Sequence, residues 1–229
     1  MAGKRVMVVA AHADDETLGC GGTIARHAAV GDEVSVVFMT DGVGARDANM
    51  KSGGATDAGE RDDAAKAALA ALGVTRFHRH SFPDNAMDQT PLLTIAKALE
   101  ADFAEVRPQT VYTHHHGDLN VDHRATHEAV MTALRPQPGL AVETILSFEV
   151  MSSTEWRAPS AATAFIPDWH VDISETLEAK TRALAAYEAE MREWPHSRSI
   201  AALEHLARHR GATMGVAAAE AFKLIRAIR

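Results

Sequence analysis

The sequence has a single cysteine and no excess of positive charge. One thiol, Cys20, among 229 residues excludes an internal disulfide framework and a four-thiolate zinc site. The 23 Lys and Arg residues against 31 Asp and Glu give a net charge of −8. This argues against a general nucleic-acid or membrane-surface binder, because such proteins need cationic fields. We therefore expect neither a nucleic acid nor a membrane as a partner.

Long hydrophobic runs are also missing. No apolar stretch approaches the roughly 18 residues that a membrane-spanning helix needs. Residues 6–11 are apolar and follow Lys4 and Arg5, as in a signal peptide, but His12 and three acids at 14–16 come directly afterwards. A secretory hydrophobic region does not tolerate such a sequence. We expect a cytoplasmic protein.

The chain does contain enough apolar material for one large core. Hydrophobic residues make up 46% of it, and a chain of this size can bury roughly 70% of its unfolded surface. Continuous apolar runs are typical of strands buried on both faces. The patterns predict strands at 6–11, 33–39, 75–82, 109–113 and 142–150, alternating with helices at 19–30, 60–72, 90–106 and 121–134. Such alternation predicts an α/β layered fold with a mainly parallel sheet.

The pattern changes after residue 150. Residues 174–193, 200–210 and 216–228 are predicted to be helical, which gives a helical C-terminal part. We interpret 1–229 as a single domain in which 151–229 covers the sheet or supports oligomerisation. The polar, glycine-rich segment 43–57 is expected to be a mobile loop, with Arg46 over a pocket.

Two clusters of metal-ligating residues follow predicted strands. Residues 12–16 (HADDE) come after the first strand, and ligands in open parallel sheets bind beyond the carboxyl ends of strands. His12 and Asp15 can each offer an atom to a divalent ion such as Zn²⁺. Asp14 would point away from the ion, and its carboxylate could hold a proton taken from a water molecule. Alternatively, both aspartates cap the following helix.

The second cluster, residues 114–123 (HHHGDLNVDH), follows the strand at 109–113. Four histidines and two carboxylates in ten residues are costly to hold together without a metal or solvent. At most two rings of the triplet 114–116 can face one site, because strand side chains alternate in direction. His127 lies one helical turn after His123 and is either a site residue or a core residue.

Together the two clusters resemble the LmbE/PIG-L family of zinc-dependent N-deacetylases. The resemblance runs over nearly the whole chain, from the HADDE and NVDH motifs to Arg61, residues 83–85 (PDN), 152–156 (SSTEW) and 195–199 (PHSRS). It implies a Rossmann-like three-layer sandwich. It also implies an enzyme that removes acetyl groups from N-acetylglucosaminyl and related amino sugars.

The resemblance also assigns roles to residues of this chain. It makes His12, Asp15 and His123 the ligands of one zinc per chain, with other divalent metals possible, and Asp14 the general base. Arg61 and Asp84 match positions that contact the sugar. The family's first motif usually has proline at position 13, where this chain has alanine. The family's histidine three residues before the last ligand is also absent.

That departure leaves the oxyanion donor open, since Asn120 stands where the histidine is expected. We name His196 as the donor, supplied from the C-terminal region or from a neighbouring subunit, with His116 and Asn120 as alternatives. Asp122 is expected either to support a ligand imidazole or to cap the helix that follows. A site completed by a neighbour would make the protein a homo-oligomer.

The expected reaction is metal-dependent hydrolysis of an N-acetyl group, in which Asp14 activates a water held on zinc for attack on the amide. The amino sugar is free, glycan-linked or nucleotide-linked. One alternative is an amidase that cleaves a larger acyl group or a thiol conjugate; another is a non-enzymatic binding protein on the same fold. A dinucleotide-binding protein fits poorly, because Ile24 breaks the required glycine spacing.

Overall fold

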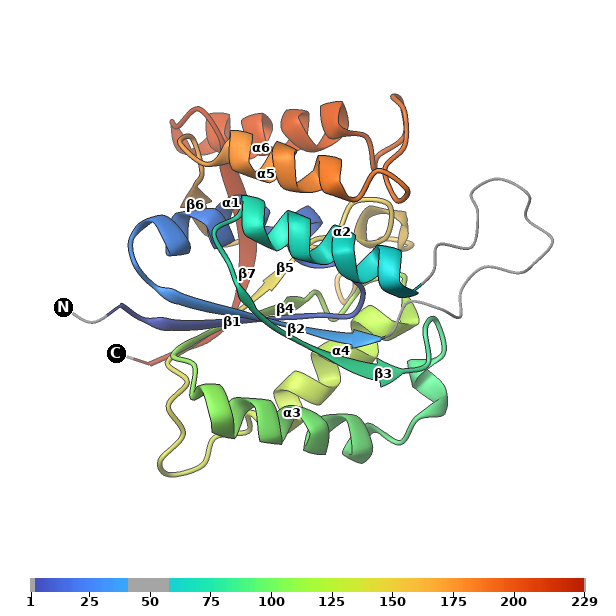
Figure 1. The fold of residues 1–229 in the computed structure, drawn as a ribbon, viewed down its shortest axis with the longest axis vertical. Helices are drawn as coiled ribbons and strands as arrows, with labels where there is room; N and C mark the ends of the chain where they lie inside the picture. The colour runs from blue at the N-terminus through green and yellow to red at the C-terminus, as the bar shows by residue number, and fades with distance from the viewer. Residues whose placement is uncertain (1–2, 41–57, 229) are drawn as a thin grey trace.

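The computed structural model describes residues 3–40 and 58–228, and these form one twisted sheet between two layers of helices (Figure 1). The seven strands lie in the order β3-β2-β1-β4-β5-β7-β6. Strands β3, β2, β1, β4 and β5 pair in parallel, whereas β7 pairs antiparallel with both β5 and β6. Their bounds are β1 Arg5–Ala10, β2 Glu33–Thr40, β3 Arg76–Phe82, β4 Thr110–His114, β5 Thr144–Phe148, β6 Trp169–Asp172 and β7 Ala219–Ala227.

The helices cover both faces of this sheet (Figure 1). Helices α3 and α4 lie on one face, and α1, α2, α5 and α6 lie on the other. The bounds are α1 Asp15–Ala29, α2 Ala58–Ala71, α3 Leu92–Val106, α4 Val121–Ala133, α5 Leu177–Ala186 and α6 Ile200–Met214, with 3₁₀ turns at Met87–Gln89 and Thr154–Trp156. The predicted three-layer α/β fold with a mostly parallel sheet is confirmed.

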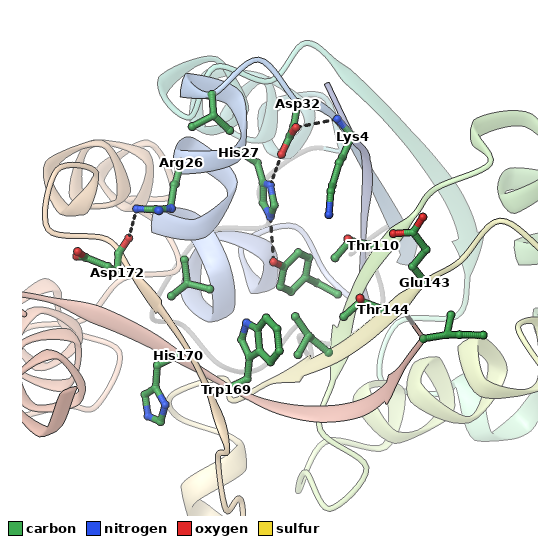
Figure 2. A pocket seen from close by; sticks show the side chains of 15 residues that line it. Lys4, Arg26, His27, Asp32, Thr110, Glu143, Thr144, Trp169, His170 and Asp172 are labelled. Atoms are coloured by element: carbon green, nitrogen blue, oxygen red, sulfur yellow. Dashed lines mark hydrogen bonds and ion pairs between the residues drawn. The ribbon is translucent and has the colours of Figure 1, made fainter. Parts of the chain in front are cut away.

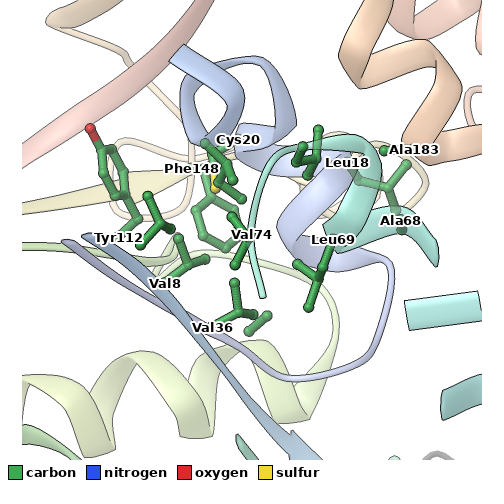
Figure 3. Close-up of a cluster of buried hydrophobic side chains, with 14 of the residues drawn as sticks. Val8, Leu18, Cys20, Val36, Ala68, Leu69, Val74, Tyr112, Phe148 and Ala183 are labelled. Carbon is green, nitrogen blue, oxygen red and sulfur yellow. The ribbon is translucent and has the colours of Figure 1, made fainter. Parts of the chain in front are cut away.

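Strand β1 shows why its sequence is a continuous apolar run. Val6 and Val8 join the core under α1 and α2, while Met7 and Val9 join the core under α3 and α4. All four side chains are fully buried. The first of these cores also contains Cys20, packed among Leu18, Phe148 and Tyr112 (Figure 3). Because both faces of β1 are covered, every residue of the strand after Arg5 is apolar and buried.

The C-terminal part differs from the prediction. Residues 216–228 were predicted to be helical, but β7 occupies Ala219–Ala227 between β5 and the edge strand β6, and β6 was not predicted at all. The helix predicted at 174–193 ends at Ala186. Alanine-rich segments have high helix propensity, but pairing with β5 and β6 and the burial of Phe222 outweigh that weak preference.

A buried ion pair fixes the bend of α1. Cys20 has non-helical backbone angles, φ −146° and ψ 24°, inside the helix. The Glu220 carboxylate of β7 accepts hydrogen bonds from the backbone N–H groups of Gly22 and Thr23 at 2.9 and 2.7 Å. It therefore acts as an N-cap for the second half of α1. Lys180 of α5 lies 2.6 Å from the same carboxylate and balances its charge.

Two predictions are not addressed by the described residues. The expected mobile loop at 43–57 and Arg46 within it lie outside them. Within 3–40 and 58–228, no helix combines the length and the apolar character needed to cross a membrane.

Candidate metal centre and catalytic pocket

The candidate site forms where parallel strands end at the same edge of the sheet. β1 and β4 are neighbours, so the segment after Ala10 and the segment after His114 emerge side by side. The first segment carries His12 to Asp15 into α1, and the second leads into α4, whose first turn contains His123. The turn after β3 adds Asp84. Residues more than a hundred positions apart are thereby brought together.

His12, Asp15 and His123 each place one ligand atom within 4.8 Å of the others. The Asp15 Oδ2 atom lies 3.1 Å from His12 Nδ1 and 3.2 Å from His123 Nε2. Burial would raise the pKa of Asp15, but His123, His114 and His12 outweigh it and hold that pKa well below its ordinary value. Two imidazoles and an ionised carboxylate converging in a buried pocket form a donor set that suits Zn²⁺.

The remaining nitrogen of each candidate histidine ligand faces a buried carboxylate. His12 Nε2 lies 3.0 Å from Asp122 Oδ2 and 3.1 Å from Asp84 Oδ1. His123 Nδ1 lies 3.1 Å from Asp118 Oδ1. Histidines that hold metals commonly have such a carboxylate partner, which fixes the ring and its tautomer. The sequence analysis assigned no role to Asp118. Its position between the triplet 114–116 and His123 is the signal that could have indicated one.

Asp122 supports an imidazole and does not cap α4. Its carboxylate also accepts the backbone N–H groups of Asn85 and Met87, at 2.6 and 3.0 Å. The N-cap of α4 is Asn120, whose side-chain oxygen accepts the N–H groups of Asp122 and His123. Of the two predicted roles for Asp122, the structure therefore shows the contact with a candidate ligand.

Asp14 lies beside this cluster in a strained backbone conformation. Its φ of 125° is rare for a residue with a side chain. Its N–H donates to the buried Glu16 carboxylate at 3.0 Å, which holds this conformation. Burial raises the pKa of Asp14 to about 7, although the Arg198 guanidinium, 2.8 Å from Oδ2, acts in the opposite direction.

The segment 195–199 reaches the site through Arg198 and not through His196. Arg198 lines the pocket and contacts Asp14. The His196 side chain instead accepts a hydrogen bond from the Arg198 backbone N–H at 3.0 Å and packs against the edge of Trp156. His196 is not among the pocket-lining residues of this chain. Sequence reasoning singled out the right loop but chose the histidine over the arginine two positions later.

Only the first histidine of the triplet reaches the centre. His114 Nε2 lies 3.5 Å from Asp15 Oδ2, and its ring stacks on that of His123. His115 and His116 contact the backbone carbonyl groups of Thr163 and Ala162. His116 is thus directed away from the pocket, contrary to its role as an alternative oxyanion donor.

His127 and Asn120 also have defined partners. His127 Nδ1 donates to the carbonyl oxygen of His114 at 2.8 Å, so it braces the end of β4. Of the two roles open to His127, the structural one holds. Asn120 lines the pocket, but its amide nitrogen donates to Asn85 Oδ1 at 3.0 Å.

The pocket above the cluster has a volume of about 200 Å³ and a largely polar lining. Arg61 of α2 and Asp84, the two predicted sugar contacts, both line it. Arg61 is also 3.6 Å from Glu190, another lining residue. Charged groups that line a pocket can hydrogen-bond a ligand rich in hydroxyl groups.

A larger cavity of about 700 Å³ lies at the opposite edge, where β1, β4 and β5 begin (Figure 2). There Asp32, His27 and Tyr112 form a chain of hydrogen bonds, 2.7 Å from Asp32 to His27 and 2.9 Å from His27 to Tyr112. None of the site residues predicted from the sequence lines this cavity. The candidate site is therefore the smaller pocket, which contains the converging ligands.

The chain belongs to the PIG-L family, described as GlcNAc-PI de-N-acetylase, whose sequence profile matches residues 7–134. A relative in Mycobacterium sp. strain JLS, 1D-myo-inositol 2-acetamido-2-deoxy-α-D-glucopyranoside deacetylase, is 31% identical. The match covers 89% of this chain and 79% of the relative. The predicted LmbE/PIG-L membership is confirmed, and this relative is a deacetylase of an N-acetylated sugar.

Solved structures share the fold. The N,N'-diacetylchitobiose deacetylase of Pyrococcus horikoshii superimposes with a TM-score of 0.77 at 21% identity, covering 97% of this chain and 84% of the other. The 4-carboxy-2-hydroxymuconate hydratase of Pseudomonas putida KT2440 also gives 0.77 at 21% identity, with 99% and 98% covered. Because the second enzyme is a hydratase, this fold alone does not define the reaction.

Proposed function

We propose that this protein is a zinc-dependent deacetylase that hydrolyses the N-acetyl group of an amino sugar. The observation that carries the proposal is the convergence of His12, Asp15 and His123 beside the buried carboxyl group of Asp14. Membership in a family with N-acetyl-sugar deacetylases supports the same reaction. The sugar is N-acetylglucosaminyl in type, either free or linked to a glycan or nucleotide.

His12, Asp15 and His123 would hold the metal. A zinc ion bound there supplies Lewis acidity that polarises the acetyl carbonyl group and makes water more acidic. Asp118 and Asp122 orient the two imidazoles, and Asp15 contributes the negative charge that favours a cation. The same donor set accepts other divalent ions, so zinc over iron or manganese is part of the proposal.

Asp14 handles the protons of the reaction. As a carboxylate it accepts a proton from the attacking water, and as a carboxylic acid it returns that proton to the leaving amine. A pKa of about 7 lets the same group do both near neutral pH. Arg198 holds the carboxylate in place and favours its ionised form. His196 as oxyanion donor would have to come from a neighbouring subunit of a homo-oligomer.

Arg61 and Asp84 are proposed to contact the sugar. Both line the pocket, where the guanidinium of Arg61 offers donors and the carboxylate of Asp84 offers an acceptor. Asp84 lies 3.1 Å from His12, so its substitution would also disturb a metal ligand. Substitution of Arg61 therefore tests the sugar contact more directly than substitution of Asp84. It should raise KM more than it lowers kcat.

The test is release of primary amine from N-acetylglucosamine, N,N'-diacetylchitobiose and the inositol-linked N-acetylglucosaminide, with chelated and zinc-restored protein side by side. Amine release that disappears on chelation and returns with zinc supports the proposal. Release from larger N-acyl or thiol-conjugated amides alone would favour an amidase. Bound zinc without any hydrolysis would favour a binding protein, and absence of bound metal would overturn the proposal.

A further inference from the structure

A second cluster of metal-ligating side chains lies on β3, outside the pocket described above. β3 is at one edge of the sheet, and its residues His78 and His80 are two positions apart. Side chains two apart on a strand project from the same face. On that face lies α3, whose Asp102 meets both histidines. A sheet edge and a helix thus bring together two imidazoles and one carboxylate.

The three side chains already approach a ligand arrangement. His80 Nε2 lies 2.7 Å from Asp102 Oδ2, and His78 Nε2 lies 4.0 Å from Asp102 Oδ1. The two rings are 4.6 Å apart and nearly perpendicular, at 81°. One ligand atom from each residue lies within 4.8 Å of the others. With bonds of 2.0–2.1 Å, ligand atoms on a tetrahedral ion are about 3.3 Å apart.

A small movement of one flexible side chain would complete this geometry. The His80 and Asp102 side chains are only 17% and 12% exposed, so they form a fixed base. His78 is 57% exposed and can rotate with little loss of packing. The exposed side also leaves coordination positions for water, as in sites with three protein ligands. The neighbouring cation on this face, Arg76, is paired with Glu105 at 2.5 Å.

We propose that His78, His80 and Asp102 form a second site for a divalent transition-metal ion, distinct from the catalytic centre. Imidazole and carboxylate ligands in this combination suit Zn²⁺, Ni²⁺ or Cu²⁺ and not Ca²⁺ or Mg²⁺, which prefer oxygen-only ligands. The bound ion takes the position of the proton between His80 and Asp102. It thereby links the edge strand to α3.

The experiment counts zinc ions per chain after metal removal, zinc titration and gel filtration, using elemental analysis and calorimetry. The wild-type protein, His78→Ala, His80→Gln and His123→Ala are compared. A matched control is His209→Ala, which removes an exposed histidine from α6. We expect His78→Ala and His80→Gln each to bind one zinc fewer than wild type, and His209→Ala to bind the same number. Circular dichroism verifies that each variant is folded.

The decisive quantity is the difference between wild type and His78→Ala. If this difference is zero, the cluster is only a His–Asp contact and the inference is overturned. The difference does not depend on catalysis: if no amine is released from any sugar but His78→Ala still loses one zinc, the proposed function fails and the second site stands. His123→Ala should lose the catalytic ion and keep the β3 ion. The double variant, with both His78→Ala and His123→Ala, should bind no zinc.

Discussion

At the scale of single residues, the proposed chemistry depends on where Asp14 is held. Its strained φ belongs to the turn between β1 and α1, where the side chain is buried and meets Arg198. Strain of this kind costs about 1–3 kcal/mol and persists only where the surroundings enforce it. Here the enforcing contact is the Glu16 carboxylate, which accepts the N–H group of Asp14.

Asp14→Asn should therefore abolish most turnover while leaving the metal ligands intact. Loss of a general base typically lowers rates by a factor of about 10²–10⁴. The measurement is kcat on the best substrate of the panel together with zinc content. Asp88→Asn, which changes an exposed acid of the 3₁₀ turn, is the control. A kcat equal to that of wild type would rule out Asp14 as the base.

Asp32 at the opposite edge allows a prediction for acid stability. Desolvation by burial would raise its pKa, but hydrogen bonds from His27 and from the Lys4 N–H together outweigh it, so the pKa is lowered. A lowered folded-state pKa stabilises the fold above the unfolded value of about 3.9, and this contribution is lost as pH falls through the folded value. Asp32→Asn should cost about 0.5–1 kcal/mol at pH 5.

Urea unfolding from pH 5 to pH 2.5 measures this difference. The gap between wild type and Asp32→Asn should close as the pH falls, whereas the exposed Glu33→Gln control should show no such gap. A gap that widens toward low pH would contradict the assignment.

At the scale of elements, the ion pair between α5 and β7 secures the bend of α1. The Lys180 and Glu220 side chains are 6% and 4% exposed, so removing either partner would leave a buried charge unpaired at a high cost in free energy. Glu220 also supplies the acceptor for two N–H groups of α1. The pair therefore connects α5, β7 and α1.

Lys180→Met should destabilise the protein by about 3–5 kcal/mol, because it leaves a buried carboxylate without its partner. The free energy of unfolding in urea measures the effect. Lys223→Met is the control: this lysine lies on β7, as Glu220 does, and its partner Asp168 is 45% exposed. That variant should lose less than about 1 kcal/mol. Equal losses would show that burial of the Lys180 pair is unimportant.

At the scale of the whole molecule, β7 makes the C-terminal part integral to the sheet. It lies between β5 and β6 and carries the buried Phe222 into the same core as β1. A segment placed inside a sheet cannot unfold without exposing the strands on both sides. That residues 1–229 form a single domain stays a prediction, which unfolding experiments can test.

Calorimetry should accordingly show one cooperative unfolding transition. Removal of residues 216–229 should abolish the fold, since β6 would lose its partner strand and β5 would keep only β4. Two separated transitions, or a folded truncated protein, would instead show that the C-terminal part is an independent layer.

The sequence by itself determined the parallel sheet and the candidate ligands. The apolar run of β1 and the residues after it are adjacent in the chain, and parallel strands bring their carboxyl ends to one edge. His12 and Asp15 could therefore be proposed from their place after a strand, and the family resemblance added His123 as the third ligand.

Only the tertiary structure decided what surrounds those ligands. Arg198 contacts Asp14, although 184 positions separate the two residues in the chain. Asp118 contacts His123 because of the path that the loop between β4 and α4 takes. The strand β7 was not predicted, because an alanine-rich sequence favours a helix in isolation. In the folded protein, strand pairing outweighs that preference. Contacts of this range depend on how the layers pack, and no local pattern in the chain records that packing.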